Sequence, residues 1–502
     1  MSQQELELPQ GWIETNVGII SKLLRGVSYK KDQAKKNKAN NLIPILRANN
    51  FNQTFLLDDL VYLPKNLIKS EQMIQKNDII LSMSSGSKRL VGKSILATSD
   101  MNYAFGTFCG LIRPSKLIHG KLLGFFLHSA EYRNIISSLS KGSNINNLRR
   151  EHIELLRFSL PPLNEQKRIV SKIDELFSKI DSTKQSLEDT KLQLEQYRQS
   201  LLKSAFEGKL TKKWREENIQ NIVSNENRLK EILEKRNELW IKRNELLQKN
   251  KRKKYVKPQS PNSKNFPRLP NSWFWGSFDQ VSERITVGHV GSMKNEYISS
   301  GIPFLRSQNV RTNRFEFVGM KFISKKFHNT LQKSKLEPND VVVVRSGSVG
   351  TSCVIPLNVK DANCSDLVII KQPHGILSKF GSYYINSIVE TQIKLQKVGI
   401  ALDHFNTNSV AKLPLPIPTI QEQEQIVLQI EQGFSLIQNT TKIVESSLQN
   451  LQTMKMSVLK QAFEGKLVPQ DPNDEPASVL LEKIKSTKES QNTKQRRMKN
   501  VK

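Results

Sequence analysis

The stretch SAFEGKL at residues 204–210 returns as QAFEGKL at residues 461–467, and this recurrence decides how the rest of the chain is interpreted. Six identical residues, 257 positions apart, are rare by chance in a chain of 502 residues. At that offset residues 161–210 align without a gap to residues 418–467, and 21 of the 50 aligned pairs are identical. Self-similarity of this length predicts a duplicated pair of domains, because the period is far too long for a solenoid repeat.

The duplication extends, more weakly, into the regions that precede these stretches. LPQGW at 8–12 is echoed by LPNSW at 269–273, and NDIILSMSSGS at 77–87 is echoed by NDVVVVRSGS at 339–348. The chain is therefore predicted to consist of two halves, each a variable region followed by a better-matched one.

Residues 164–206 carry the clearest helical pattern, and residues of the second half repeat it. An apolar residue recurs at every seventh position, which is typical of a coiled-coil seam. Pro161 and Pro162 exclude helix before this segment, Asn164 is a suitable N-cap and Gly208 a suitable stop. The predicted seam residues are Ile173, Ile180, Leu187, Leu194 and Leu201 in the first helix and Ile430, Ile437, Val444, Leu451 and Val458 in the second.

Neither helix is apolar on all sides, so each needs one partner. The simplest partner is the other helix, and we expect an intramolecular antiparallel pair in which each helix runs about 65 Å. A parallel pair and a homodimer are the alternatives that the seam leaves open.

The regions before each helix contain short β-branched runs bounded by Asn, Asp, Gly or Pro, which indicate strands. Each of these regions ends in a more helical stretch, at 121–140 and at 376–396. The fold class is therefore predicted as α+β, with two mixed α/β domains in a pseudo-two-fold internal repeat. The predicted segments are a mixed domain at 1–160, a long helix at 161–215, a charged helical segment with a basic linker at 216–265, a mixed domain at 266–416, a long helix at 417–467, and a helix with a basic tail at 468–502.

Composition limits the classes of partner and compartment. The net charge is +30 and the isoelectric point about 9.9, which favours a polyanion partner, most often nucleic acid. A generally lysine-rich composition is the alternative, and the Lys/Arg-rich tail at 485–502 is expected to be disordered.

Cys109, Cys353 and Cys364 form no CxxC pair, which argues against a disulfide framework or a zinc site and fits a reducing cytoplasm. The N-terminus does not resemble a signal peptide, and no apolar run is long enough to span a membrane.

No motif of a self-contained active site is present in the sequence. GSKRLVGKS at 86–94 approaches a phosphate-binding loop, but Gly86 and Gly92 enclose five residues where the motif needs four. We interpret it as a Gly/Ser loop between strands, in which Lys88 and Arg89 could touch DNA phosphates. There is no Asn/Asp-Pro-Pro-aromatic signature of an adenine methyltransferase, and the histidines lack ligand spacing. We therefore expect no catalytic, cofactor-binding or metal-binding residues.

Arg joined to Asn or Gln in two matching stretches suggests contacts to DNA, because Arg can bind guanine and Asn or Gln can bind adenine through two hydrogen bonds. The stretches are LRANN at 46–50 and LRSQNVRTNR at 305–314. Such residues are equally common in polar loops, and the match of Arg47 with Arg306 favours a role in the fold or at the DNA backbone as the alternative. The candidate DNA contacts are Arg47, Asn49, Asn50, Lys88, Arg89, Arg306, Gln308, Asn309, Arg311 and Arg345.

Four further stretches resemble a known family, the specificity subunits of type I restriction–modification systems. They are LPPLNEQKRIVSKIDELFSKID (160–181), IPTIQEQEQIVLQIEQGFSLI (417–437), LTKKWREEN (210–218) and LVPQDPNDEPASVLLEKI (467–484). Together with the paired AFEGKL endings, the resemblance covers nearly the whole chain.

The resemblance implies that 1–160 and 266–416 are target-recognition domains, each reading half of a bipartite site in double-stranded DNA. It implies that the long helices hold these domains apart and dock two adenine-N6 methyltransferase subunits, and through them restriction translocase subunits. S-adenosylmethionine, ATP and Mg²⁺ would then be bound by the partners, and this chain would be a noncatalytic cytoplasmic subunit. The alternatives are a free-standing duplicated DNA-binding regulator or a coiled-coil scaffold, whereas a fused restriction–methylation enzyme would need catalytic motifs.

Overall fold

The computed structural model describes residues 8–52, 54–87, 90–139, 146–218, 224–246, 249, 252, 254–264, 266–396 and 406–500. The chain divides into two compact units: unit 1 comprises Met1–Glu188 with Glu445–Lys502, and unit 2 comprises Asp189–Val444. Both boundaries fall inside long helices, so each unit contains part of both helices and one of the two sheet regions. Within the described part of the chain, no helix is long and apolar enough to cross a membrane.

Unit 1 is built around two sheets. Among its described residues, four strands form an antiparallel sheet in the order β2-β9-β5-β7, and three form a mixed sheet in the order β4-β3-β8. Side chains of β5 alternate between two cores, because successive strand residues face opposite sides: Ile79 packs with the helices and Ile80 packs against Leu46 of the second sheet. The strands are β2 (Ser21–Arg25), β3 (Leu42–Leu46), β4 (Val61–Pro64), β5 (Ile79–Ser82), β7 (Ser94–Leu96), β8 (Ala104–Phe105) and β9 (Cys109–Pro114).

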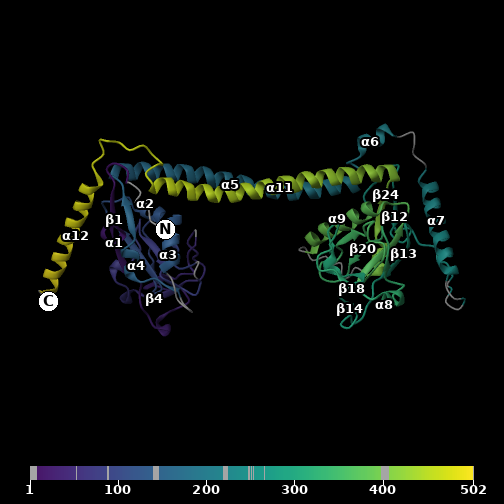
Figure 1. Cartoon of the computed structure of the whole chain (residues 1–502), viewed down its shortest axis with the longest axis horizontal. Helices are drawn as coiled ribbons and strands as arrows, with labels where there is room; N and C mark the ends of the chain where they lie inside the picture. The colour runs from purple at the N-terminus through teal and green to yellow at the C-terminus, as the bar shows by residue number, and fades with distance from the viewer. Residues whose placement is uncertain are drawn as a thin grey trace. The chain divides into compact units, whose positions relative to one another are not determined.

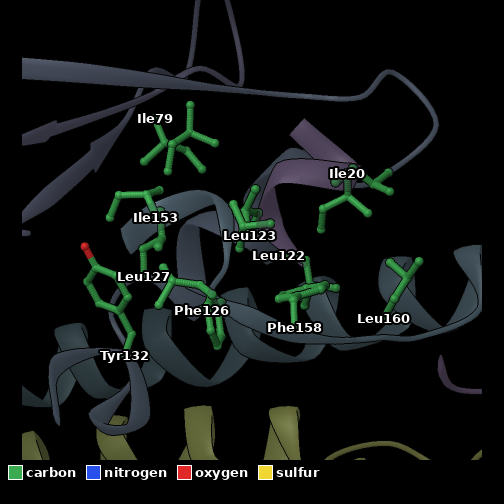
Figure 2. Packing of buried hydrophobic residues seen from close by; sticks show 14 of the residues in the cluster. Ile20, Ile79, Leu122, Leu123, Phe126, Leu127, Tyr132, Ile153, Phe158 and Leu160 are labelled. Atoms are coloured by element: carbon green, nitrogen blue, oxygen red, sulfur yellow. The ribbon is translucent and has the colours of Figure 1, made fainter. Parts of the chain in front are cut away.

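Short helices of unit 1 cover the outer face of the four-stranded sheet. Two of them occupy the stretch 121–140 that the sequence predicts to be helical. Figure 2 shows Leu122, Leu123, Phe126 and Phe158 in one packed cluster, in which the rings of Phe126 and Phe158 meet edge to face at 5.2 Å. The elements are β1 (Ile13–Asn16), α1 (Val17–Ile20), β6 (Ser84–Ser85), α2 (Gly120–Phe126), α3 (Ala130–Leu139), β10 (Asn146–Asn147), α4 (Arg150–Glu154) and β11 (Arg157–Leu160), with 3-10 turns at Lys31–Gln33, Lys65–Leu67 and Ser70–Gln72.

Unit 2 has a four-stranded sheet of the same order, in which β13, β23, β20 and β21 take the places of β2, β9, β5 and β7. In its described residues a second, five-stranded sheet has the order β14-β18-β15-β22-β19. Figure 1 labels β13 and β20 of the four-stranded sheet, β14 and β18 of the five-stranded sheet, and the nearby helix α9 (Ser378–Gln396). The strands are β12 (Phe274–Ser277), β13 (Ser282–Val287), β14 (Tyr297–Ile298), β15 (Ile302–Leu305), β16 (Val310–Arg311), β17 (Arg314–Phe315), β18 (Lys321–Ile323), β19 (Lys335–Leu336), β20 (Val341–Val344), β21 (Ser352–Val354), β22 (Ala362–Cys364), β23 (Leu367–Pro373) and β24 (Pro414–Ile417).

The helices of unit 2 complete an α+β architecture, which confirms the predicted class. They are α8 (Lys325–Thr330), α9 (Ser378–Gln396) and α10 (Thr407–Lys412), with a 3-10 turn at Ser307–Asn309. The helix α9 agrees with the helical stretch predicted at 376–396.

Two helices of 44 residues follow the sheet regions: α5 (Leu163–Phe206) and α11 (Ile420–Phe463). In unit 1, Lys455 Nζ of α11 lies 2.5 Å from Asp181 Oδ1 of α5. In unit 2, Leu201 of α5 packs so closely on Gly433 of α11 that a Cβ there would come within 2.4 Å of Leu201 Cδ2. In both units a late residue of one helix therefore faces an early residue of the other, which is an antiparallel arrangement.

The predicted seam residues differ in how deeply they are buried. Ile173, Ile180, Leu201, Ile430 and Val444 are buried. Leu187, Leu194, Ile437, Leu451 and Val458 are partly exposed. In unit 1, Ile173 of α5 shares a core with Leu459 of α11.

The start of α5 is fixed by a buried carboxylate. Trp12 donates a hydrogen bond of 2.9 Å from Nε1 to Oε2 of Glu165, and Gln470 donates one of 3.2 Å to Oε1. Burial raises the pKa of the Glu165 carboxyl above its ordinary value, and the hydrogen bonds from Gln470 and Trp12 oppose that rise. Next to it, Gln166 accepts a bond from the backbone N–H of His119 and donates one to the carbonyl of Pro161, each 2.9 Å long.

The start of α11 in unit 2 has the same construction. Trp273 donates to Oε2 of Glu422 over 2.8 Å, while Thr211 and Arg215 donate to Oε1 over 2.7 and 3.0 Å. Gln423 accepts from the backbone N–H of Leu377 and donates to backbone carbonyls. The recurring Glu-Gln pair therefore joins each long helix to its own sheet region.

The remaining helices are α6 (Lys212–Glu217), α7 (Asn225–Glu245) and α12 (Ala477–Asn500). The expectation of a disordered tail at 485–502 is wrong for residues 485–500, which belong to α12. Lys488 of α12 donates to the carbonyls of Gly18 and Ser21 over 2.7 and 2.8 Å, and α12 lies beside β1 and α1 (Figure 1). The apolar side of α12 packs into the unit 1 core through Leu480, Leu481 and Ile484, which gives this lysine-rich segment a reason to be helical.

Helix α7 of unit 2 is held in a comparable way. Arg236 donates to the carbonyl and to the carboxylate of Asp279, each over 2.7 Å. Ile232 of the same helix packs in the core of unit 2. A helix that follows a long helix therefore covers the start of the sheet region in each unit.

Candidate nucleic-acid interface

In unit 1, the ends of several strands meet at one border of the sheets. β3 runs parallel to β8, and the N–H of Gly106 donates to the carbonyl of Leu46 over 2.9 Å, so the segments after both strands start side by side. The N–H of Met83, just after β5, donates to the carbonyl of Phe108 over 2.9 Å. We call the residues 47–50, 83–85 and 106–108 the unit 1 edge.

Unit 2 has the same border. The N–H of Ser365 donates to the carbonyl of Leu305 over 2.9 Å, which places the segments after β15 and β22 side by side. Arg345 follows β20 and reaches Asp366, which precedes β23. We call the residues 306–309, 345–348 and 365–366 the unit 2 edge. Six of the predicted DNA contacts that the structure describes, Arg47, Asn49, Asn50, Arg306, Gln308 and Asn309, lie in the first segments of these edges, and Arg345 lies in the second edge as well.

The loop after β3 is organised by Asn50, whose side chain is 1% exposed. Its Oδ1 accepts from the N–H of Arg47 over 2.9 Å, and its Nδ2 donates to the carbonyl of Asp59 over 2.7 Å. Arg47 donates to the carbonyl and carboxylate of Asp59 over 2.9 and 2.8 Å, and Asn49 donates to the same carboxylate over 3.2 Å. These side chains hold the loop in one shape.

The loop after β15 repeats this pattern. Asn309 is 0% exposed, accepts from the N–H of Arg306 over 3.1 Å and donates to the carbonyl of Glu316 over 3.0 Å. Arg306 and Gln308 both donate to the carbonyl of Gly319, over 2.9 and 3.1 Å. The matched arginines thus hold matched loops, in line with the alternative role in the fold that the sequence left open.

Asn50 and Asn309 are therefore poorly placed to bind a base. Both amides use their donors and acceptors inside their own loops and are buried, so the physical reason for matching Asn residues is loop geometry. The sequence pattern could not separate the two roles, because a loop-forming Asn and a base-reading Asn look the same in one sequence.

Arg311 is exposed and projects from a two-residue hairpin between β16 and β17. The turn residue Asn313 has a φ of 56°, a left-handed conformation that Asn tolerates better than most residues. The buried side chain of Asn386 in α9 donates to Oδ1 of Asn313 over 2.6 Å. The turn of the hairpin that carries Arg311 is thus anchored to α9.

Arg345 makes an ion pair of 2.9 Å with Oδ1 of Asp366, and Ser346 donates to Oδ2 of the same carboxylate over 3.0 Å. Asp366 has a φ of 48°, so the backbone carries strain at this place. Lys88 and Arg89, the remaining predicted contacts, lie outside the described residues.

A lysine-rich segment was missed among the sequence candidates. KKDQAKKNK at 30–38 contains five lysines and one aspartate, and all five lysines are exposed. Lys35 exchanges two backbone hydrogen bonds of 2.9 Å with Tyr62 of β4, so the segment flanks the sheet that carries the Arg47 loop. The local density of lysine was the signal that could have identified it.

No group of His, Cys, Asp or Glu suited to holding a metal ion occurs among the described residues. Cys109, Cys353 and Cys364 are buried as free thiols, and burial raises the pKa of Cys109 and of Cys353 to about 12. The edges instead offer the arginines Arg47, Arg306 and Arg345, and the exposed lysines of 30–38 lie on the sheet that carries the Arg47 loop. Such cationic groups suit phosphates and base edges.

Comparison with known proteins gives the family. Residues 9–191 and 224–446 match the family model described as the type I restriction modification DNA specificity domain. The type I restriction enzyme EcoKI specificity subunit of Escherichia coli (strain K12) is 31% identical over 499 residues, with 96% of each chain covered. The StySPI specificity subunit of Salmonella potsdam is 30% identical over 498 residues, again with 96% of each chain covered.

Solved structures agree on the fold. A chain from a study of complex assembly and conformational transition of the type I R-M system has a TM-score of 0.63 at 16% identity, covering 92% of this chain and 99% of that one. The HsdS subunit from Thermoanaerobacter tengcongensis has a TM-score of 0.55 at 15% identity, covering 93% and 100%. The relatives are named as specificity subunits, in accord with the expectation of a noncatalytic subunit. The family model spans most of the chain and a relative matches across nearly all of it, and therefore this chain belongs to the DNA specificity subunits of type I restriction–modification systems.

Proposed function

We propose that this specificity subunit reads a bipartite site in double-stranded DNA, with one half contacted by the unit 1 edge and the other by the unit 2 edge. The observation that carries the proposal is that both units repeat one strand order and gather their strand ends at equivalent edges. The edges differ in their side chains, as two readers of different DNA words require.

The proposed contacts have different roles. Arg311 and Arg345 are candidates for base reading in the second half, since an arginine can donate two hydrogen bonds to guanine. Lys88, Arg89 and the lysines of 30–38 would bind phosphates and hold the duplex. Arg47, Asn49, Arg306 and Gln308 would shape the loops and contact the backbone, while Asn50 and Asn309 would keep those loops rigid.

The long helices α5 and α11 are proposed to form an antiparallel coiled-coil pair that sets the spacing between the half-sites. Their heptad pattern, equal length and close approach at Gly433 support this role.

Helix α11 also offers a surface for a partner. Leu428, Leu436 and Ile443 are exposed apolar residues in unit 2, and their spacing of eight and seven places them on one side of the helix. We propose this row as part of the docking surface for one of two methyltransferase subunits, which in turn would carry the restriction subunits.

The chemistry would belong to those partners. S-adenosylmethionine would serve adenine methylation in a methyltransferase pocket after base flipping, and ATP with Mg²⁺ would serve the restriction subunits. This chain would supply position and sequence choice, with the complex acting in the cytoplasm.

Expression of the chain together with its methyltransferase subunit, in a host that lacks this methylation, tests the proposal. Base-resolution methylation sequencing should reveal methylated adenines in two fixed words separated by a spacer without sequence preference. Omission of the chain should abolish this motif. Methylation of the same motif without the chain, or of a continuous word, would overturn the proposal.

A further inference from the structure

The two edges place chemically opposite residues at one equivalent position. In unit 1, Ser82 at the end of β5 pairs with Cys109 at the start of β9, so Met83 and Phe108 come next on either side. In unit 2, Val344 at the end of β20 pairs with Leu367 of β23, so Arg345 and Asp366 come next. The pair is apolar in unit 1 and charged in unit 2. If the two units bind different DNA half-sites, they must differ at the residues that contact bases. This pair position differs between the units, so it is a candidate for base contact.

Phe108 is exposed although it is a large aromatic residue. It is 68% exposed, and it stands in a tight turn in which the N–H of Cys109 donates to the carbonyl of Gly106 over 2.9 Å. The turn is also held by Thr107, which donates to the carbonyl of Val27 over 3.4 Å, and by Met83, whose N–H bonds the carbonyl of Phe108 itself. The backbone is thus fixed on both sides while the ring remains in water. A contact made by this ring would need little ordering of the chain.

The residues around Phe108 indicate which ligand its ring contacts. The N–H of Gly106 donates a hydrogen bond to the carbonyl of Leu46, which directly precedes the Arg47 loop. The lysines of 30–38 flank the sheet β4-β3-β8 to which this loop belongs. In a DNA specificity subunit, an exposed apolar ring on a sheet flanked by exposed lysines is placed to meet a duplex. The 5-methyl group of thymine is the apolar group that the major groove presents.

We propose that this pair position determines specificity in both halves: Phe108 contacts the methyl group of a thymine in the first half-site, and Arg345, held by Asp366, donates to a guanine in the second. The inference rests on the proposed function. It adds the base type that each unit selects at this place.

The test uses the full chain with its methyltransferase subunit and a duplex that carries its own methylated motif. Binding is measured by fluorescence anisotropy at one fixed salt concentration. Phe108→Ala should weaken binding by about tenfold, the scale of one mismatched base pair. The control is Leu155→Ala in the connection between α4 and β11, where Leu155 is 67% exposed, and it should leave binding unchanged.

Replacement of each thymine of the first half-site by uracil removes one methyl group at a time. One such replacement should weaken wild-type binding by about fourfold, the worth of one apolar carbon. The same replacement should not weaken binding by Phe108→Ala further, because the ring that senses the methyl is gone. Replacements in the second half-site should affect both proteins equally.

Three results would overturn the inference. Phe108→Ala could bind like Leu155→Ala, it could keep the wild-type response to every uracil, or the first half-site could contain no thymine. In each case a bipartite motif would still be read, so the proposed function would survive. Loss of the bipartite motif in the wild-type complex would instead be a failure of the proposed function.

The charged pair of unit 2 is tested by a separate experiment. Arg345→Lys keeps the charge but loses the planar two-donor group, so it should relax one base pair of the second half-word and leave the first intact. A methylated motif that is unchanged in Arg345→Lys and in Asp366→Ala would contradict the charged half of the inference.

Discussion

Trp273 donates a hydrogen bond of 2.8 Å to the buried carboxylate of Glu422 at the first turn of α11. Trp12 and Glu165 repeat this bond at the first turn of α5, over 2.9 Å. A carboxylate at a helix N-terminus is favoured by the helix dipole, and the indole satisfies one oxygen that burial would otherwise leave without a donor. Each bond joins the residue just before the first strand of a sheet region, β1 or β12, to the long helix that follows that region.

Trp273→Phe should destabilise unit 2 by about 1–3 kcal/mol, because it removes a donor from a buried carboxylate and leaves a smaller aromatic ring in the core. Urea unfolding of the full chain measures the change. The matched control is Trp275→Phe, which removes only an exposed bond of 3.2 Å to the carbonyl of Pro267 and should cost less than about 0.5 kcal/mol. Equal losses in the two variants would contradict a special role for the Glu422 contact.

His328 should make unit 2 sensitive to mild acid. Burial lowers the pKa of this histidine, Lys335 and Lys325 act in the same direction, and Asp361 opposes them. The amide of Asn363 donates to Nδ1 over 2.6 Å, since Oδ1 of that amide already accepts from Ser334, and such a bond needs the neutral ring. Because the unfolded chain binds the proton more readily, this stability is complete above about pH 6.5 and is lost as the pH falls below it.

The check compares the thermal unfolding of wild type and His328→Leu at pH 7.5 and pH 5.5. The wild type should lose more stability on acidification than the variant, and the variant should be the less stable protein at pH 7.5. If both proteins lost the same stability between the two pH values, His328 would not be the group that titrates.

The sequence predicted the long helices closely because their signal is local. The heptad pattern and the paired prolines predicted a first helix at 164–206, and α5 spans Leu163–Phe206. The Val run of β20 and the apolar run of β5 also indicated strands correctly, since β-branched residues bounded by Asn-Asp carry that signal within a few positions.

Other features depend on contacts between distant residues. Asn50 and Asn309 owe their burial to carbonyls several residues downstream, and no pattern distinguished that role from base reading. Lys488 bonds the carbonyls of Gly18 and Ser21, more than 460 positions earlier, so composition alone made α12 resemble a disordered tail. No sequence motif marks Phe108. Its candidate role emerges only when the pair of Met83 and Phe108 is compared with the pair of Arg345 and Asp366 in unit 2.

The long helices should act as a ruler. One heptad corresponds to about 10.5 Å of helix at 1.5 Å per residue. At about 3.4 Å of rise per base pair, that length is roughly three base pairs. Deletion of 181–187 together with 438–444 keeps the seven-residue period, so the half-words should persist while the unread spacer shortens by up to that amount. Bending or twisting of DNA can absorb part of the change.

Methylation sequencing of the doubly deleted subunit with its partner measures the spacer. Deletion of four residues from each helix is the control, because it breaks the seam and should weaken folding. An active complex whose spacer is unchanged after the heptad deletion would show that the helices do not set the distance.

The central claim, that each half of the chain reads its own half-site, is tested most directly by one exchange. Residues 266–416 are replaced by the corresponding region of a relative, and the chimera is expressed with the methyltransferase subunit for base-resolution methylation sequencing. The account predicts a motif in which the second half-word changes to that of the relative while the first half-word stays as in the wild type. A motif in which both half-words change, or in which neither does, would contradict it.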